Sequence, residues 1–194
     1  MGMSDPSGSV RIMRIFTRYR ILNAARAMVA EVGVERVTMR GIAAMANVTA
    51  GAIYKHFRNK RELLDQVVAH GYRELSIRML KRGQKAPTRP RSLRVMIDEA
   101  AVYAERHPNL FQMMAAPRTD DAEAVTRLEH EVEACMAAKA LPYDNSEKVT
   151  VAIWSLMRGF LARRPAGEDR PRYRAVVDLL FGSIATERYA RSAA

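Results

Sequence analysis

The stretch TMRGIAAMANVTAGAIYKHFRNK, residues 38–60, decides how the N-terminal part of this chain folds. Thr38 can cap a helix over 39–45, and Thr49 can cap a second helix through His56, because a threonine hydroxyl accepts a free N–H of the first helical turn. The residues between them, 46–48, form the turn. Two short helices joined by such a turn are typical of a helix-turn-helix, whose second helix enters the DNA major groove. The apolar seam of the two helices is Ile42, Ala43, Ala46, Val48, Ile53 and Phe57.

Positive charge is concentrated around this stretch. The 194 residues carry a formal net charge of +11, and residues 1–82 hold 15 Lys and Arg against 6 Asp and Glu, whereas residues 83–194 hold 17 against 15. A concentrated positive field attracts polyanions, so the distribution favours a nucleic-acid partner. Charge alone leaves open a basic surface that has no partner.

Cysteine content and hydropathy narrow the class of protein. A single cysteine, Cys135, excludes an intrachain disulfide and a cysteine-based zinc site, and this suits a reducing cytoplasm. No apolar run approaches the roughly 18 residues that span a bilayer. The first ten residues, MGMSDPSGSV, lack the apolar centre of a signal peptide and suggest a disordered tail. We therefore expect a soluble cytoplasmic protein.

The remainder of the chain repeats an apolar period of 3.6 residues, which predicts an all-α fold of about nine helices. In the first helix, Ile12, Ile15, Phe16 and Tyr19 continue the apolar face, and Gly33 ends the helix. Four arginines near its start, Arg11, Arg14, Arg18 and Arg20, fit phosphate or minor-groove contacts and fit a solvated face equally well. The expected helices cover residues 11–32, 39–45, 49–56, 60–82, 92–107, 108–115, 120–140, 147–162 and 172–189.

These residues resemble the N-terminal domain of the TetR family of bacterial transcriptional regulators. The segments that carry the resemblance are RYRIL (18–22), Ala25, Gly33, TMRGIA (38–43), VTAGAIYKHF (48–57) and NKRELL (59–64). The C-terminal part is similar, more weakly, to one ligand-domain type of this family through HPNLFQMM (107–114) and through Trp154 with Gly159. Two positions depart from the family pattern: Asn47, where glycine is frequent, and Arg158, where histidine is frequent.

The resemblance implies roles for nine residues of the helix-turn-helix. Thr49, Ala50 and Gly51 would approach the bases, and Arg40 and Lys55 would reach a base edge or a phosphate. The implied phosphate contacts are Thr38, Tyr54, His56 and Lys60. Two alternatives stay open, since Tyr54 can pack against the first helix and His56 can be an ordinary surface residue. Gly41 has no evident role, although glycine inside a helix costs about 1 kcal/mol relative to alanine.

The resemblance also implies an organisation for the rest of the chain. A helix-turn-helix domain over 11–58 is followed by a connecting helix over 59–84 and by a ligand-binding and dimerisation domain over 85–194. Two such chains would form a homodimer on a palindromic operator of double-stranded DNA. The expected dimer contacts, which burial inside the monomer would also explain, are Ile153, Phe160, Val176, Leu179, Leu180 and Ile184.

Methionine and aromatic residues of the middle helices suggest a pocket for an apolar or amphipathic small molecule. Ordinary core packing is the alternative for each of them. The expected pocket residues are Met96, Tyr103, Phe111, Met114, Trp154, Met157 and Arg158. We therefore predict a sequence-specific regulator, a repressor that a small-molecule effector releases from its operator, with no cofactor.

Three other classes of protein compete with this prediction. An enzyme would need partners for Cys135, and the chain has no HExxH, phosphate-binding loop or GxGxxG motif. A metal site over residues 129–133 is less favoured than a solvated face, because its His and Glu residues spread around a helix. A non-specific packaging protein would not need so apolar and Met-rich a body. A membrane-surface protein would display Trp or Leu beside its cations, and the basic helices do not.

Overall fold

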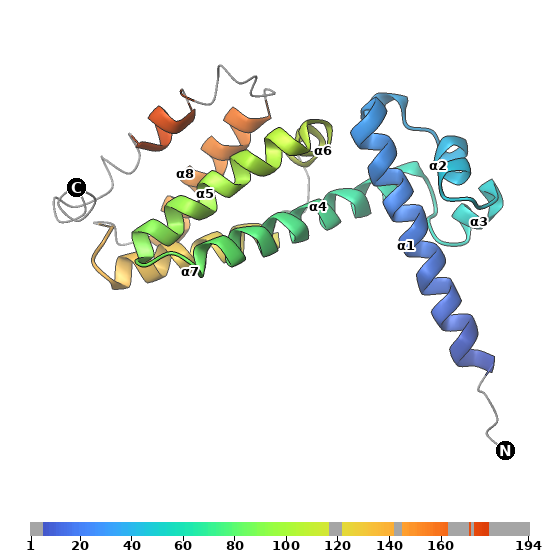
Figure 1. The fold of residues 1–194 in the computed structure, drawn as a ribbon, viewed down its shortest axis with the longest axis horizontal. Helices are drawn as coiled ribbons and strands as arrows, with labels where there is room; N and C mark the ends of the chain where they lie inside the picture. The colour runs from blue at the N-terminus through green and yellow to red at the C-terminus, as the bar shows by residue number, and fades with distance from the viewer. Residues whose placement is uncertain (1–5, 117–121, 142–144, 163–170, 172, 179–194) are drawn as a thin grey trace. The chain divides into compact units, whose positions relative to one another are not determined.

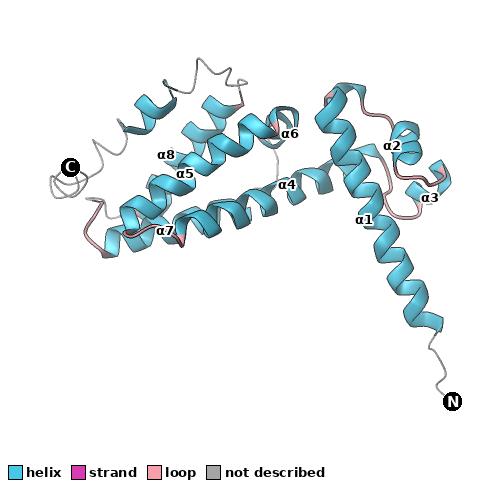
Figure 2. Cartoon of the chain, viewed as in Figure 1, coloured by secondary structure: helices cyan, strands magenta, loops and turns pink. Residues whose placement is uncertain are grey.

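The computed structural model describes residues 6–116, 122–141, 145–162, 171 and 173–178. Every regular element in these ranges is a helix, as Figure 1 shows, which confirms the all-α class. Figure 2 shows only loops and turns between the helices. The chain divides into two compact units, residues 1–68 and 69–194. The elements in order are α1 (Pro6–Val32), the 3-10 helix η1 (Val34–Arg36), α2 (Met39–Met45), α3 (Ala50–Tyr54), α4 (Lys60–Gly83), α5 (Arg89–Arg106), α6 (Pro108–Met114), α7 (Ala122–Ala137) and α8 (Ser146–Leu161).

The core of the first unit forms where α2 packs on the C-terminal half of α1 and α3 packs on α2. Gly33, with φ of 77°, ends α1, and its N–H donates to the carbonyl of Val29. This is the helix end that the sequence predicts. The buried side chains of this core include Ile21, Ala25, Val29, Ile42, Ile53, Phe57, Leu63 and Val67.

The N-terminal half of α1 differs from the prediction in two respects. The helix begins at Pro6, so residues 6–10, expected to be disordered, are helical. Ile12, Ile15, Phe16 and Tyr19 are exposed, although their spacing places them on the apolar face. The reason is helix length: at about 1.5 Å per residue, the 27 residues of α1 far outreach the 7 of α2 and the 5 of α3. Figure 1 shows the start of α1 extending beyond both short helices.

The second unit is built around α5, which contacts α6, α7 and α8. Glu99 of α5 is buried, and its carboxylate lies 3.5 Å from Arg78 Nη1 and 3.5 Å from Arg82 Nε, both on α4. This charge cluster holds the second half of α4 to α5. Among the described residues, none of the helices combines the length and the apolar character that crossing a bilayer requires.

Two helices of the second unit begin at residues other than those predicted. Thr88 caps α5, and its Oγ1 accepts the N–H of Arg91 at 3.4 Å, so the helix starts three residues before Ser92. Pro90 permits this start because the first helical turn has no use for its missing N–H. Asn145 caps α8, where its Oδ1 accepts the N–H of Lys148 at 2.8 Å, so the helix starts one residue before the predicted 147. Of the last predicted helix, residues 173–178 are helical, and Leu179, Leu180 and Ile184 lie outside the described residues.

Candidate nucleic-acid interface

The turn between α2 and α3 closes as the sequence predicts. The N–H of Val48 donates to the Ala43 carbonyl at 3.0 Å, and the N–H of Asn47 donates to the Ala44 carbonyl at 3.1 Å. This pair of hydrogen bonds is a Schellman motif, which requires a residue in the left-handed conformation just after the helix. Asn47 has φ of 51°, a conformation that asparagine adopts more easily than other residues with a side chain. The departure from the family's glycine therefore leaves the turn intact.

Arg20 of α1 holds the same turn from outside. Its Nη2 donates to the carbonyl oxygens of Ala46 and of Asn47, groups that the end of a helix leaves without intrahelical partners. Arg18 is likewise structural: its guanidinium lies 4.8 Å from the Phe57 ring centroid, and its Nη2 donates to Gln66 Oε1 at 3.3 Å. The sequence left these two arginines undecided between DNA contact and solvated face. Their positions assign them to packing of the first unit.

Two threonines cap the helices of the motif, as predicted. Thr38 Oγ1 accepts the N–H of Gly41 at 3.1 Å, and Thr49 Oγ1 accepts the N–H of Ala52 at 3.2 Å. A cap uses a hydroxyl only as acceptor, so each O–H remains able to donate. Thr38 and Thr49 are both exposed.

Most of the predicted DNA-contacting residues are exposed, and they lie on α2, on α3 and on the segments that flank α3. Ile53 is fully buried, whereas Tyr54 is 56 % exposed, so more than half of the Tyr54 side chain is open to solvent. A Cβ added at Gly51 would meet no atom within 4 Å. His56 and Lys60 are half-buried, and the remaining predicted residues are exposed: Arg40, Thr49, Ala50, Gly51 and Lys55.

Gly41 has a packing role that the sequence did not reveal. A Cβ at this position would lie 2.4 Å from Met28 Cε of α1 and 3.1 Å from the capping oxygen of Thr38. The Met28 side chain of α1 therefore occupies the space that a Cβ at Gly41 would need. This packing is compatible with a glycine that weakens the helix by itself.

The start of α4 is fixed by a reciprocal cap. Asn59 Oδ1 accepts the N–H of Glu62 at 2.9 Å, and Glu62 Oε2 accepts the N–H of Arg58 at 2.7 Å. The backbone hydrogen bond from Arg58, followed by its side-chain hydrogen bond, lowers the pKa of Glu62. This arrangement places Lys60 in the first turn of α4, directly after the helix-turn-helix.

His56 lies in a positive environment. Partial burial is the first cause of its lowered pKa, and the charges of Arg14, Arg18 and Lys55 add to the shift. His56 is therefore neutral at pH 7 in the free protein. A nearby anion would oppose each of these cationic effects and would raise this pKa again.

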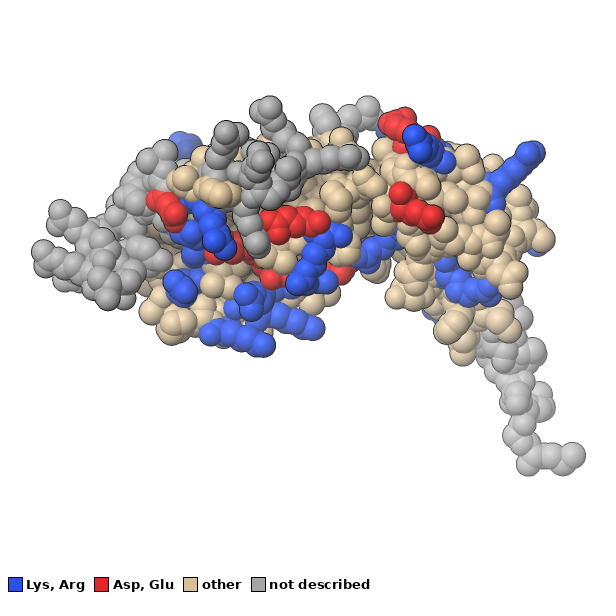
Figure 3. Space-filling model, turned by 45° about the horizontal axis from the view of Figure 1, so that its top comes forward, with Lys and Arg blue, Asp and Glu red and all other residues tan. Residues whose placement is uncertain are grey.

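The distribution of charge changes when it is counted by structural unit. Residues 1–68 hold 11 Lys and Arg against 5 Asp and Glu, and residues 69–194 hold 21 against 16. The first unit thus carries +6 and the second +5, because the cations of the second half of α4 belong to the second unit. Figure 3 shows Lys and Arg on the surface of both parts. The first unit is more basic per residue, but it does not hold nearly all of the excess charge.

Six of the seven predicted pocket residues are buried. Met96, Tyr103, Phe111, Met114, Trp154 and Met157 are all buried. Tyr72 donates to the Met114 carbonyl at 2.5 Å, and its ring centroid lies 5.9 Å from that of Trp154. A Cβ at Gly71 would lie 2.7 Å from Met114 Sδ, so α4 packs tightly against this cluster.

Arg158, predicted as a polar contact of the ligand, has a structural role in the single chain. Its Nη2 donates to the carbonyls of Ala115 and Ala116, each at 3.0 Å. These carbonyls end α6, so Arg158 caps that helix from α8. The arrangement parallels that of Arg20 at the end of α2.

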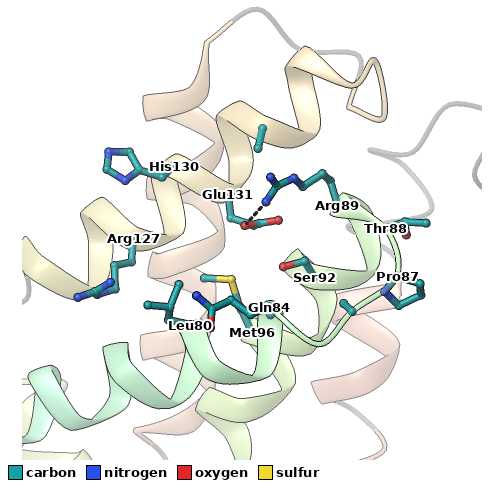
Figure 4. Close-up of a pocket in the computed structure, with 13 residues that line it drawn as sticks. Leu80, Gln84, Pro87, Thr88, Arg89, Ser92, Met96, Arg127, His130 and Glu131 are labelled. Carbon is teal, nitrogen blue, oxygen red and sulfur yellow. Dashed lines mark ion pairs between the residues drawn. The ribbon is translucent and has the colours of Figure 1, made fainter.

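A cavity of about 850 Å³ lies elsewhere in the second unit, where the end of α4, the 84–88 turn, the start of α5 and the middle of α7 meet (Figure 4). Of the predicted pocket residues, Met96 alone lines it. The sequence did not indicate this cavity, because its charged residues occupy helix positions that the 3.6-residue period assigns to the solvent-exposed face. Its polar lining consists of Gln84, Thr88, Arg89, Ser92, Arg127, His130 and Glu131.

The predicted dimer contacts have mixed exposure in the single chain. Ile153 is only 2 % exposed, so it belongs to the monomer core and offers almost no surface to a second copy. Phe160 and Val176 are half-buried, and the Phe160 ring centroid lies 5.6 Å from that of Tyr173. The outward residues of α8 are Glu147, Lys148, Val151, Ala152, Ser155 and Gly159.

Cys135 is the residue on which a competing enzyme function would depend. Cys135 is fully buried, and burial, followed by the charge of Glu131, raises its pKa to about 12. Its thiol therefore stays neutral and is a poor nucleophile. Within the described ranges, no three His, Cys, Asp or Glu residues come together in a way that would hold a metal ion.

A capped helix-turn-helix with an exposed second helix defines a DNA-binding protein. The family profile "Bacterial regulatory proteins, tetR family" matches residues 21–67. The HTH-type transcriptional repressor Rv1474c of Mycobacterium tuberculosis is 30% identical over 185 residues, covering 86% of this chain and 92% of that protein. The chain therefore belongs to the TetR family, and it is a DNA-binding transcriptional regulator.

Solved structures agree with this fold. The structure of RolR with resorcinol has a TM-score of 0.75 at 16% identity and covers 91% of each chain. The structure of AibR with isovaleryl coenzyme A and operator DNA has a TM-score of 0.61 at 18% identity, and it covers 87% of this chain and 98% of AibR.

Proposed function

We propose that this regulator is a homodimeric repressor that binds a palindromic operator through α2 and α3 and leaves it when a small molecule binds the second unit. The observation that carries the proposal is the outer side of α3. There Gly51 has open space around it while Ile53, two residues on, is fully buried. A helix that is buried on its inner side and exposed on its outer side can enter a major groove without a rearrangement of the first unit.

The residues of this surface divide into base readers and phosphate contacts. Thr49, Ala50 and Gly51 bring a methyl group or bare backbone to the base edges, and Arg40 and Lys55 supply donors beside them. Thr38 donates its O–H to a phosphate while its oxygen caps α2. Tyr54, His56 and Lys60 complete the phosphate contacts, which set register, whereas base contacts set sequence preference.

Dimerisation uses the outward face of α8 together with the helix that includes 173–178. Val151, Ala152, Ser155 and Gly159 form an uncharged strip of this face, and small side chains allow two helices to approach closely. Two units would then meet successive major grooves about 34–36 Å apart. Ile153 has no part in this interface, because it is buried in its own chain.

Release by a small molecule follows from differential binding. A ligand that favours a spacing of the two DNA-binding units mismatched to the operator lowers DNA affinity, with a typical coupling of about 1–3 kcal/mol. The solved RolR and AibR complexes each hold a small organic ligand. Their likeness supports a ligand-responsive second unit here but not the identity of the ligand.

Selection of bound sequences from a random DNA pool tests the operator. We expect one palindromic sequence to be enriched, and its affinity to survive an excess of competitor DNA. Enrichment of no sequence would favour a non-specific packaging protein.

Phosphate contacts are tested by the salt dependence of operator binding. Lys60→Ala should reduce the slope of log affinity against log salt by about one contact or less, and Tyr54→Ala should weaken binding without changing sequence preference. Lys81→Ala is the matched control, since Lys81 is an exposed lysine in the last turn of the same helix. Equal effects of Lys60→Ala and Lys81→Ala would remove Lys60 from the interface.

The dimer is tested at Gly159. A Cβ at this position meets no atom within 4 Å in the single chain, so Gly159→Leu should fold normally. We expect the variant to be monomeric in sedimentation experiments at micromolar concentration, where the unchanged protein is dimeric. A monomeric unchanged protein, or a dimeric variant, contradicts the proposed face.

A further inference from the structure

The cavity between α4, α5 and α7 has the dimensions and the mixed lining of a small-molecule site. Its volume of about 850 Å³ lies within the roughly 300–1,000 Å³ of ligand pockets. Leu80, Pro87, Met96 and Ala134 give it apolar walls, and Figure 4 shows Glu131 of α7 and Arg89 of α5 facing each other at one side. A ligand that fills it must therefore be amphipathic.

The charge of the lining favours an anion. Two arginines, Arg89 and Arg127, line the cavity together with one carboxylate, Glu131. Arg89 also occupies the first turn of α5, where the helix dipole is positive. The cavity and its charged side chains make the site, and the helix start only adds to their field.

Arg89 and Glu131 form a long ion pair, and each side chain keeps hydrogen-bonding atoms that the pair does not use. Arg89 Nη1 lies 3.5 Å from Glu131 Oε2, which is longer than the roughly 2.7–2.9 Å of a charge-assisted hydrogen bond. The Arg89 side chain is 61 % exposed, and a guanidinium has five N–H donors. Glu131 Oε1 is buried and accepts no hydrogen bond within the described part of the chain. Arg89 can thus bind a second carboxylate, and Glu131 can accept a hydroxyl.

We infer that this cavity binds an amphipathic carboxylic acid that also carries a hydroxyl group, and that such acids are the effectors of the regulator; the effector role rests on the proposed function above. The carboxylate binds Arg89, the hydroxyl donates to Glu131, and the hydrocarbon part lies against Leu80 and Met96. The same cavity is lined by Gly83, the last residue of the helix that begins at Lys60. A Cβ at Gly83 would lie 2.7 Å from Ser92 Oγ, so α4 and α5 touch here, and a ligand lodged beside this contact acts directly on α4.

Calorimetry on the full chain without DNA tests binding. The probes are decanoate, 3-hydroxydecanoate and decanamide, with hexanoate and 4-phenylbutyrate and their amides to vary the apolar part. We expect each acid to bind roughly tenfold more tightly than its amide, as a charge-assisted hydrogen bond permits, and the hydroxy acid to bind most tightly. Equal affinity of every acid and its amide overturns the inference.

Variants locate the site. Arg89→Gln should remove the preference for acid over amide, whereas Arg91→Gln, an exposed arginine in the same turn that does not line the cavity, should keep it. Glu131→Met should remove only the advantage of 3-hydroxydecanoate over decanoate. A preference for acid over amide that survives Arg89→Gln would place the carboxylate elsewhere and overturn the assignment.

The effector role is measured separately, by adding the tightest acid to the complex with the selected operator. Release from the operator by the acid, absent in Arg89→Gln, supports the role. An operator that is bound but unaffected by a bound acid overturns the effector role and leaves the proposed DNA function standing. If no operator sequence is selected, the proposed function is wrong, whatever the cavity binds.

Discussion

The DNA-facing side of α3 and the Met-rich core of the second unit were both predicted as binding surfaces, and they differ in exposure. Tyr54 on α3 is 56 % exposed, whereas Met114 in the second unit is fully buried. A surface that reads DNA must be displayed by a rigid helix before DNA arrives. A ligand cavity is instead the space that packed helices leave unfilled, so the most apolar residues are the ones that fill the core around it.

Met114→Ala has the largest expected effect, and it tests whether the Met-rich residues are a packed core. The side chain is buried against Gly71 of α4, so its removal should destabilise the protein by about 2–5 kcal/mol. Chemical denaturation measures the loss. A loss below about 1 kcal/mol would mean that the side chains around Met114 are loosely packed, as in an adaptable pocket. The ligand site would then be assigned to the residues that the sequence predicted.

Gly51→Leu tests the opposite property on α3. Nothing surrounds this position in the free protein, and replacing a helical glycine should raise stability by up to about 1 kcal/mol. Operator affinity should nevertheless fall roughly 10- to 100-fold, because a leucine keeps the helix from the base edges. Anisotropy titration and thermal unfolding give the two numbers. Unchanged affinity would place α3 outside the groove.

Arg20 and Arg158 make a matched pair across the two units, since each donates to two carbonyls at a helix end. Arg20→Gln and Arg158→Gln should each cost about 1–3 kcal/mol of stability. Only Arg20→Gln should also weaken operator binding by the ligand-free protein, because its partners are the turn before α3. Equal loss of DNA affinity in both variants would show that the effect is general destabilisation.

His56 gives the smallest expected effect. Its pKa is lowered in the free protein, so His56 is neutral at pH 7.5, and its contribution to folding stability declines as the pH falls through the unfolded value near 6.5. A DNA phosphate raises the pKa, so the bound state takes up a proton. Operator affinity should therefore rise by about twofold between pH 7.5 and pH 6. His56→Gln should remove this rise, and a rise that persists would assign the proton to another group.

The first unit was predictable because its signals are local. Thr38, Thr49 and Asn59 cap helices in the positions that their types favour, and Asn47 adopts the left-handed turn. Each of these interactions joins residues within a few positions of one another. The roles of Gly41, Arg18 and Arg20 were not predictable, since their partners lie on other helices.

In the second unit the sequence identified the helices but not which of their residues are buried or line the cavity. Ile153 and Met157 have the residue types of an interface and a pocket, and both are buried in the single chain. The cavity depends on Gly83, Ser92 and Glu131, which come from three helices. No periodic pattern within one helix indicates that such residues will enclose a space.

By itself the sequence determined the all-α class, the capped helix-turn-helix and the outward face of α3, because helix periodicity and capping act over a few residues. Tertiary structure alone decided which apolar residues fill the core, which arginines tie helix ends together and where a cavity remains. Those outcomes depend on how whole helices meet. Close packing leaves space only where the side chains of several elements fail to fill it.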